Sequence, residues 1–297
     1  MNITILGPGA VGSLYAYKLH LAGHSISLWG RTSSSKIEVT LDDGESIAFN
    51  NQSLEDLERC DLLVVTVKAW QVKSALLPLL THLHPDAIIL FLHNGMGTVD
   101  SLSEQLAHRP VLLGTSTHGA LKVNSSTVHH TGIGQTLIGA WNKKGQQCEF
   151  VAEVFDHGFS PAQWHSIIQQ ALWTKLVINC AINPLTAILD CRNGQLANHE
   201  YREQLFSIVK EAVTCARFDG VELDAPVLLD TVVNVAKSTA QNCSSMHQDI
   251  YNKRQSEIDF INGYVVNIAT KHHVDIPNNL SLYQKIKQIE ASWSQHD

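Results

Sequence analysis

The feature that most constrains this chain is a glycine-rich turn close to its start. Residues 7–12 read Gly-Pro-Gly-Ala-Val-Gly and match the pattern GxGxxG. They follow a short apolar run at 2–6 and open a stretch of helical composition at 10–22. In such a unit the first glycine permits a tight turn, the second lets a pyrophosphate approach the backbone, and the third permits close packing of helix and strand. We therefore predict a dinucleotide-binding turn, with a purely structural turn as the alternative.

The residues after the second predicted strand, 25–29, indicate which dinucleotide. An NAD site usually has an acidic residue about 20 residues beyond the turn, bound to the ribose hydroxyls. No carboxylate occurs between Gly7 and Glu38. Arg31 follows the strand instead, and a guanidinium offers a planar fork of donors to a 2′-phosphate. We predict NADPH as the cofactor; the alternative is that Arg31 is an ordinary solvated loop residue. Lys68 follows the apolar run at 62–67 and would add positive charge at the carboxyl ends of the predicted strands, unless it is an ordinary exposed lysine.

The first ~165 residues alternate strand-like and helix-like segments. Continuous apolar runs at 62–67 and 87–92 are typical of strands buried on both faces. This order predicts a parallel sheet with right-handed crossovers. Further strands are expected at 111–117, 127–130 and 135–138, with an antiparallel arrangement as one option.

Beyond about residue 165 the apolar residues recur at a spacing of three and four. That spacing predicts amphipathic helices at 167–182, 203–219, 226–242 and 256–272. The predicted fold class is thus α/β: a Rossmann-type parallel-sheet domain at 1–165, followed by an all-α domain at 166–297.

Composition narrows the classes of function. The chain has 21 Lys and Arg against 28 Asp and Glu, a net charge of −7, which argues against a nucleic-acid binder. Its purely apolar runs are far shorter than the ~18 residues that a membrane span needs. No basic segment precedes the first apolar run, and the six cysteines lack CxxC spacing. We expect no signal peptide, free thiols, no metal site, no membrane partner and a cytoplasmic location.

A polar stripe in the second half is the clearest candidate for chemistry. Lys175, Asn179 and Asn183 recur every four residues in an otherwise apolar stretch, which places them on one face of a helix. A solvated helix face is the alternative. Pro184 lacks a backbone donor and is expected to kink or end the helix.

Four segments, in this order, resemble the ketopantoate reductase (2-dehydropantoate 2-reductase) family. They are the glycine turn; Val-Thr-Val-Lys-Ala-Trp-Gln at 65–71 with His-Asn-Gly-Met-Gly at 93–97; Trp-Thr-Lys-Leu-Val-Ile-Asn-Cys-Ala-Ile-Asn-Pro-Leu-Thr at 173–186; and Ser-Ser-Met-His-Gln-Asp at 244–249 with Glu-Ile-Asp-Phe-Ile-Asn-Gly at 257–263. The first is generic and the last two are specific, and together they span nearly the whole chain.

The resemblance implies roles for individual residues. It implies that Lys175 is the catalytic lysine, assisted by Glu257, with substrate in the cleft of two domains. The implied cofactor contacts are Gly7, Pro8, Gly9, Ala10, Val11, Gly12, Arg31, Lys68, Asn94, Ala120 and Glu257. The implied substrate contacts are Asn94, Lys175, Asn179, Asn183, Asn193 and Ser245.

Simpler readings exist for three of these residues. Glu257 would serve as a carboxylate in the first turn of a helix, Ser245 as a helix N-cap, and Asn94 as part of an ordinary Asn-Gly turn.

The resemblance implies an NADPH-dependent oxidoreductase that reduces 2-dehydropantoate to (R)-pantoate in pantothenate biosynthesis, with Lys175 as general acid. A cationic lysine stabilises the negative charge that develops on the keto oxygen and donates the proton. The alternatives are a reductase of another small 2-oxo acid and a non-catalytic NADPH-binding sensor. A monomer or a homodimer is expected.

Overall fold

The computed structural model describes residues 1–293, which divide into two compact units. The first unit comprises Met1–His93 and Thr98–Ala171. The second unit contains the chain from Leu172 onward and also takes in the loop Asn94–Gly97. Each unit is described by itself below.

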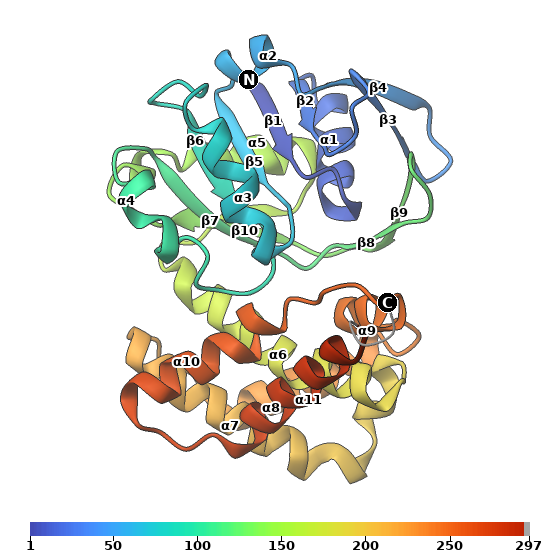
Figure 1. Cartoon of the computed structure of the whole chain (residues 1–297), viewed down its shortest axis with the longest axis vertical. Helices are drawn as coiled ribbons and strands as arrows, with labels where there is room; N and C mark the ends of the chain where they lie inside the picture. The colour runs from blue at the N-terminus through green and yellow to red at the C-terminus, as the bar shows by residue number, and fades with distance from the viewer. Residues whose placement is uncertain (294–297) are drawn as a thin grey trace. The chain divides into compact units, whose positions relative to one another are not determined.

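Within the described residues the first unit is built on one sheet of eleven strands (Figure 1). Its order is β11-β10-β7-β6-β5-β1-β2-β4-β3-β9-β8. The strands are β1 (Asn2–Leu6), β2 (Ser25–Trp29), β3 (Lys36–Leu41), β4 (Ser46–Asn51), β5 (Leu62–Val65), β6 (Ile88–Phe91), β7 (Val111–Ser116), β8 (Gly119–Lys122), β9 (Thr127–Gly132), β10 (Thr136–Ala140) and β11 (Ala162–Trp164).

The centre of this sheet is parallel and its flanks are mixed. β1 pairs in parallel with β2 and β5, and the parallel pairing continues through β6 to β7. β10 runs antiparallel to β7, and β8 runs antiparallel to β9. The parallel sheet and the strands β7, β9 and β10 were predicted correctly, and the antiparallel option holds for β10 beside β7 and for β9 beside β8. The strands β8 and β11 were not predicted. The sequence did not indicate the antiparallel hairpin of β3 and β4, whose strands are partly exposed.

Helices cover both faces of the sheet. The helices α1 (Ala10–Leu21) and α5 (Phe150–Gly158) pack with one core, whereas α2 (Leu54–Glu58), α3 (Val72–Leu76) and α4 (Ser103–Leu106) pack with the other. Alternate residues of β5 divide between these cores: Leu62 and Val64 enter the first, and Leu63 and Val65 enter the second. This alternation explains the continuous apolar runs, because both faces of each central strand are buried.

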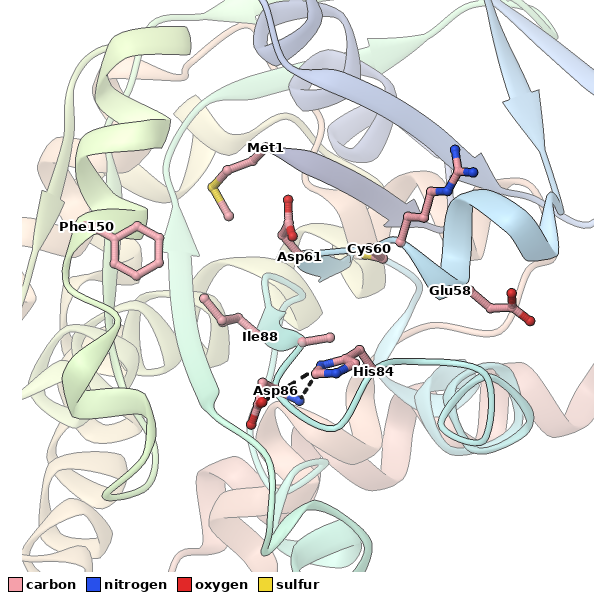
Figure 2. A pocket seen from close by; sticks show the side chains of 10 residues that line it. Met1, Glu58, Cys60, Asp61, His84, Asp86, Ile88 and Phe150 are labelled. Carbon is pink, nitrogen blue, oxygen red and sulfur yellow. Dashed lines mark hydrogen bonds and ion pairs between the residues drawn. The ribbon is translucent and has the colours of Figure 1, made fainter.

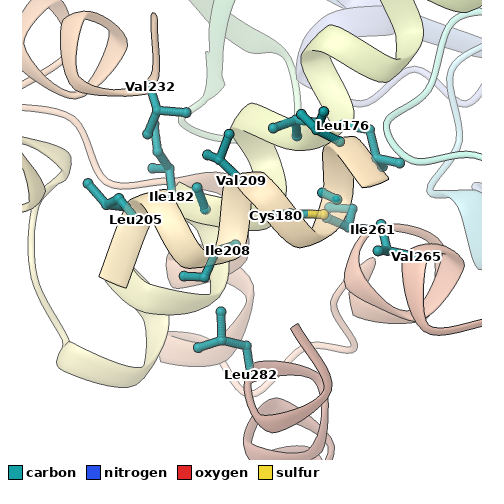
Figure 3. Packing of buried hydrophobic residues seen from close by; sticks show 14 of the residues in the cluster. Leu176, Cys180, Ile182, Leu205, Ile208, Val209, Val232, Ile261, Val265 and Leu282 are labelled. Atoms are coloured by element: carbon teal, nitrogen blue, oxygen red, sulfur yellow. The ribbon is translucent and has the colours of Figure 1, made fainter. Parts of the chain in front are cut away.

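The second unit is helical. Its helices are α6 (Ile168–Leu189, which begins in the first unit), α7 (Arg202–Ala216), α8 (Ala225–Ser238), α9 (Ser245–Tyr251), α10 (Asn262–His272) and α11 (Pro277–Trp293). Figure 3 shows Leu176 and Cys180 of α6 packed among apolar side chains of α7 and α10. The α/β sheet followed by a helical region is the predicted fold class.

One helix begins later than predicted. The periodicity indicated a helix from residue 256, but α10 starts at Asn262 and is preceded by a 3₁₀ turn at Ile258–Phe260. The backbone N–H and hydroxyl of Ser256 both donate to Glu290 Oε1 of α11, at 2.8 and 2.7 Å. This tertiary contact holds the segment as a turn, which an apolar pattern does not reveal.

The expectation that Pro184 ends its helix is wrong, because α6 continues to Leu189. Proline has no N–H to donate to the carbonyl four residues earlier, which belongs to Cys180. Asn262 Nδ2 donates to that carbonyl instead, at 3.2 Å, and also donates to Asn279 Oδ1 at 3.0 Å. Asn262 is fully buried, so it replaces the missing backbone donor inside the core.

Among the described residues, α6 is the one helix whose length and mean hydropathy would allow it to cross a membrane. Of its most apolar window, 61% is buried inside the protein. The core helix of a soluble protein has the same properties.

Candidate active site

The glycine turn has the geometry that its pattern predicts. Gly7 has φ +93°, and a Cβ there would overlap Val67. A Cβ at Gly12 would overlap Gly7 O and Thr66 Oγ1, so helix and strand approach each other closely. At Gly9, by contrast, the nearest atom to such a Cβ is Gly7 O at 4.0 Å. The backbone at Gly9 is therefore open, as a pyrophosphate-binding turn requires.

The turn lies where ligands bind in open α/β sheets. The chain leaves β1 toward β2 on one side, and β5 lies on the other side of β1. In open α/β sheets, ligands bind outside the carboxyl ends of the strands at such a switch point of the strand order. Thr66, just after β5, donates its hydroxyl to Gly7 O at 2.7 Å and so ties the two loops together. α1 begins at the turn with no side-chain cap, which leaves its positive end available to an anion.

The other residues predicted to bind the cofactor lie on different strands and loops of this unit. Arg31 is exposed in the loop after β2. Lys68 is half-buried and directly precedes the 3₁₀ turn Ala69–Gln71 that follows β5. Ala120 is half-buried in β8, opposite His130. Sequence reasoning missed Lys122, whose Nζ donates to the carbonyl of Pro8 in the glycine turn at 2.8 Å.

A hollow of about 460 Å³ lies at the opposite ends of the strands, their amino ends (Figure 2). It is lined by residues at the amino ends of strands, among them Met1, Asp61 and Ile88. Because the glycine turn is at the carboxyl ends, this hollow is separate from the candidate cofactor site.

The loop Asn94–Gly97 belongs to the second unit and is shaped by close backbone approaches. Gly95 and Gly97 have φ of +81° and +90°. A Cβ at Gly95 would come within 2.6 Å of Phe260 Cβ, and Met96 N–H donates to Phe260 O at 2.9 Å. The loop therefore does more than turn the chain. It brings Asn94 Nδ2 to 3.3 Å from Glu257 Oε2.

Lys175 and Glu257 form the charged part of the site. Lys175 is half-buried on α6, and burial lowers the pKa of its ammonium to about 8, while the negative charge of Glu257 acts in the opposite direction. Glu257 is only 3% exposed and precedes the 3₁₀ turn Ile258–Phe260. The alternative of a carboxylate in the first turn of a helix is therefore wrong, because α10 starts five residues later.

The two asparagines of the stripe continue the same helix. Asn179 is half-buried and Asn183 is buried. The alternative of a solvated helix face does not describe this stripe, since all three of its polar residues are at least half-buried. An amide can donate and accept without adding charge, which suits a substrate with a carboxylate and a hydroxyl.

Asn193 and Ser245 lie at two further turns. Asn193 is buried and donates from Nδ2 to Thr239 Oγ1 at 3.0 Å, while its Oδ1 is buried and accepts no hydrogen bond from any described residue. Ser245 is exposed and is not the N-cap of α9. That role belongs to Ser244, whose hydroxyl accepts from the His247 N–H at 3.0 Å and also bonds Thr186. Two adjacent serines both fit a cap pattern, and only the tertiary bond to Thr186 selects one of them.

Within residues 1–293, no three His, Cys, Asp or Glu side chains gather where they could hold a metal ion. The six cysteines are free thiols, as the sequence predicted.

Comparison with known proteins agrees with this geometry. Residues 3–143 match the family described as ketopantoate reductase PanE/ApbA, and residues 167–290 match its C-terminal part. A 2-dehydropantoate 2-reductase of Vibrio cholerae is 51% identical over 99% of this chain and 99% of its own.

Two solved structures are similar over almost the whole chain. A PanE/ApbA family ketopantoate reductase from Ralstonia eutropha superposes with a TM-score of 0.88 at 26% identity, covering 100% of each chain. A D-mandelate dehydrogenase solved with NADH and anilino(oxo)acetate has a TM-score of 0.88 at 23% identity, over 98% of this chain and 99% of its own, and shares the fold alone. On these matches, which include both parts of the family, the chain belongs to the ketopantoate reductase PanE/ApbA family.

Proposed function

We propose that this chain reduces 2-dehydropantoate to (R)-pantoate with NADPH, a step of pantothenate biosynthesis. The observation that carries the proposal is the group of Lys175, Glu257 and Asn94 in the second unit. It combines a half-buried lysine, a buried carboxylate and an amide bonded to that carboxylate. The 51% identity to a 2-dehydropantoate 2-reductase supports the choice of substrate.

The side chains supply acid catalysis and charge stabilisation. When bound, NADPH supplies a hydride to the keto carbon. Lys175 stabilises the charge that develops on the keto oxygen and donates a proton to it. With a pKa of about 8, its ammonium is protonated at neutral pH and still acidic enough to release the proton. Glu257 keeps the ammonium charged, and Asn94 holds Glu257 in place.

The proposal assigns each unit a role. The first unit binds NADPH through the turn Gly7–Gly12, Arg31, Lys68 and Ala120. The second unit binds the 2-oxo acid through Asn179, Asn183, Asn193 and Ser245. We propose that the enzyme acts in the cytoplasm as a monomer or homodimer, without a nucleic-acid or membrane partner. A solved structure described as a dimeric ketopantoate reductase, from Staphylococcus aureus, supports the dimer as an option.

The test is NADPH oxidation, followed at 340 nm, with 2-dehydropantoate and a panel of other 2-oxo acids. NADH is tested in parallel, as the cofactor that lacks the 2′-phosphate. We expect strong turnover only with NADPH and 2-dehydropantoate. Turnover with a different 2-oxo acid would keep the mechanism and replace the substrate. Binding of NADPH without turnover on any 2-oxo acid would favour the sensor.

A further inference from the structure

The loop that carries Arg31 is fastened from inside the first unit by one side chain. Asn51, at the end of β4, is 5% exposed. Its Oδ1 accepts from the Gly30 N–H at 2.8 Å. Its Nδ2 donates to Thr32 O at 3.0 Å and to Ser34 O at 2.7 Å. Three hydrogen bonds of one buried amide thus hold both ends and the middle of this loop.

The side chain beside it supports the same loop. Gln52 has φ +55°, and its Nε2 donates to Gly30 O at 2.6 Å. A Cβ at Gly30 would come within 2.7 Å of Ile37 and 3.1 Å of Pro8, so the loop also packs against the glycine turn. Arg31 itself is exposed. The backbone of the loop is therefore fixed while its cationic side chain faces solvent.

We propose that Asn51 is a positioning residue for the choice of NADPH over NADH. The inference rests on the proposed function, in which Arg31 binds the 2′-phosphate. A loop already held in one conformation loses less entropy when an arginine on it binds a ligand. Only an amide can accept from one backbone group and donate to two others. Asn51 never touches the phosphate; it acts through the backbone on either side of Arg31.

The experiment measures the Kd and KM of NADPH and of NADH for single and double variants. We expect Asn51→Ala to raise the Kd of NADPH by about tenfold, equivalent to about 1.4 kcal/mol of binding free energy. The kcat at saturating NADPH should stay unchanged, and the Kd of NADH should change by less than about twofold. Asn51→Asp keeps the size and one acceptor but cannot donate, and should behave likewise. In an Arg31→Ala background, Asn51→Ala should add almost nothing, because the residue acts through Arg31.

The neighbouring residue provides a matched control. Asn50 is exposed and donates to Asp56 Oδ2 at 2.9 Å, away from the loop. Asn50→Ala should leave both cofactors unaffected. If the Asn51 variants do not fold, Gln52→Ala provides a second test, because it removes a hydrogen bond to the same loop. It should cause a smaller loss of affinity for NADPH and leave the affinity for NADH unchanged.

The outcomes separate the two proposals. A wild-type enzyme that does not prefer NADPH, or does not turn over, contradicts the proposed function. If Arg31→Ala abolishes the preference while Asn51→Ala and Gln52→Ala keep it, the positioning role alone is refuted. Equal weakening of NADPH and NADH by Asn51→Ala would also refute it, since a merely structural role predicts that result.

Discussion

The two units present their candidate site residues in different ways. The first unit exposes backbone: Gly9 is open where a pyrophosphate would approach, and Gly7 and Gly12 allow the turn by having no side chain. The second unit presents side chains along one helix, and Glu257 and Asn94 come from distant segments. An added methyl group in the glycine turn should therefore disable the candidate site of the first unit, whereas the removal of a polar side-chain group should disable that of the second.

The largest effect is expected from Lys175→Ala. Loss of a general acid typically costs about 100- to 10,000-fold in rate. We expect kcat to fall by that factor while the Kd of NADPH, measured by fluorescence titration, stays unchanged. Lys271→Ala, an exposed lysine at the end of α10, is the control and should retain full activity. A folded Lys175→Ala enzyme with most of its activity would refute the assigned role.

Gly12→Ala should impair the binding of NADPH rather than the chemical step. Its Cβ would overlap Gly7 O and Thr66 Oγ1, so the turn must open. We expect the Kd of NADPH to rise by at least about tenfold and the first unit to lose about 1–3 kcal/mol of stability. Gly23→Ala is the control: unlike Gly12, Gly23 has a positive φ, +88°, but no atom of the described residues lies within 4 Å of a Cβ built there. It should be strained and destabilised, yet bind NADPH normally. Equal Kd values for the two variants would contradict this account of the turn.

The helix that carries the polar stripe depends on a substitute hydrogen bond. Asn262→Ala removes the hydrogen-bond donor to the Cys180 carbonyl and to Asn279 Oδ1. We therefore expect the free energy of unfolding to fall by about 1–3 kcal/mol. Pro184→Ala restores a backbone N–H for that carbonyl, and in this background Asn262→Ala should cost less. Chemical denaturation of the four proteins gives the coupling energy, expected to be about 0.5–3 kcal/mol.

Asn278 is the control for this cycle. Its side chain donates to Glu211 and does not reach Cys180. Asn278→Ala combined with Pro184→Ala should be additive. An additive result for Asn262 as well would mean that its bond does not compensate for the proline.

The smallest effect concerns pH. Lys175 has a pKa of about 8, so kcat/KM for reduction should be constant below that pH and fall about tenfold per unit above it, because the deprotonated amine cannot act as the acid. Glu257→Gln keeps an oxygen for Asn94 but removes the charge that raises this pKa. The decline should therefore begin at a lower pH.

Asp259→Asn removes the same charge two residues away, where the carboxylate binds Tyr283 and Lys287. It should leave the pH profile in place. If the two variants have the same profile, Glu257 does not control the protonation of Lys175.

Local pattern determined much of this protein. The glycine turn, the strands buried on both faces and the stripe of Lys175, Asn179 and Asn183 each depend on neighbours in the sequence, so the fold class could be predicted and candidate site residues could be named. A turn or a helix face is set by residues a few positions apart, and for that reason it can be recognised in one dimension.

The tertiary structure decided what depends on distant partners. It selected Ser244 over Ser245 as the cap through Thr186, and delayed α10 through the bond of Ser256 to Glu290. It also let α6 pass Pro184, because the buried Asn262 supplies a donor from elsewhere in the chain. Buried polar groups must be paired, and where their partners are far away in sequence, only the folded chain determines which partner is used.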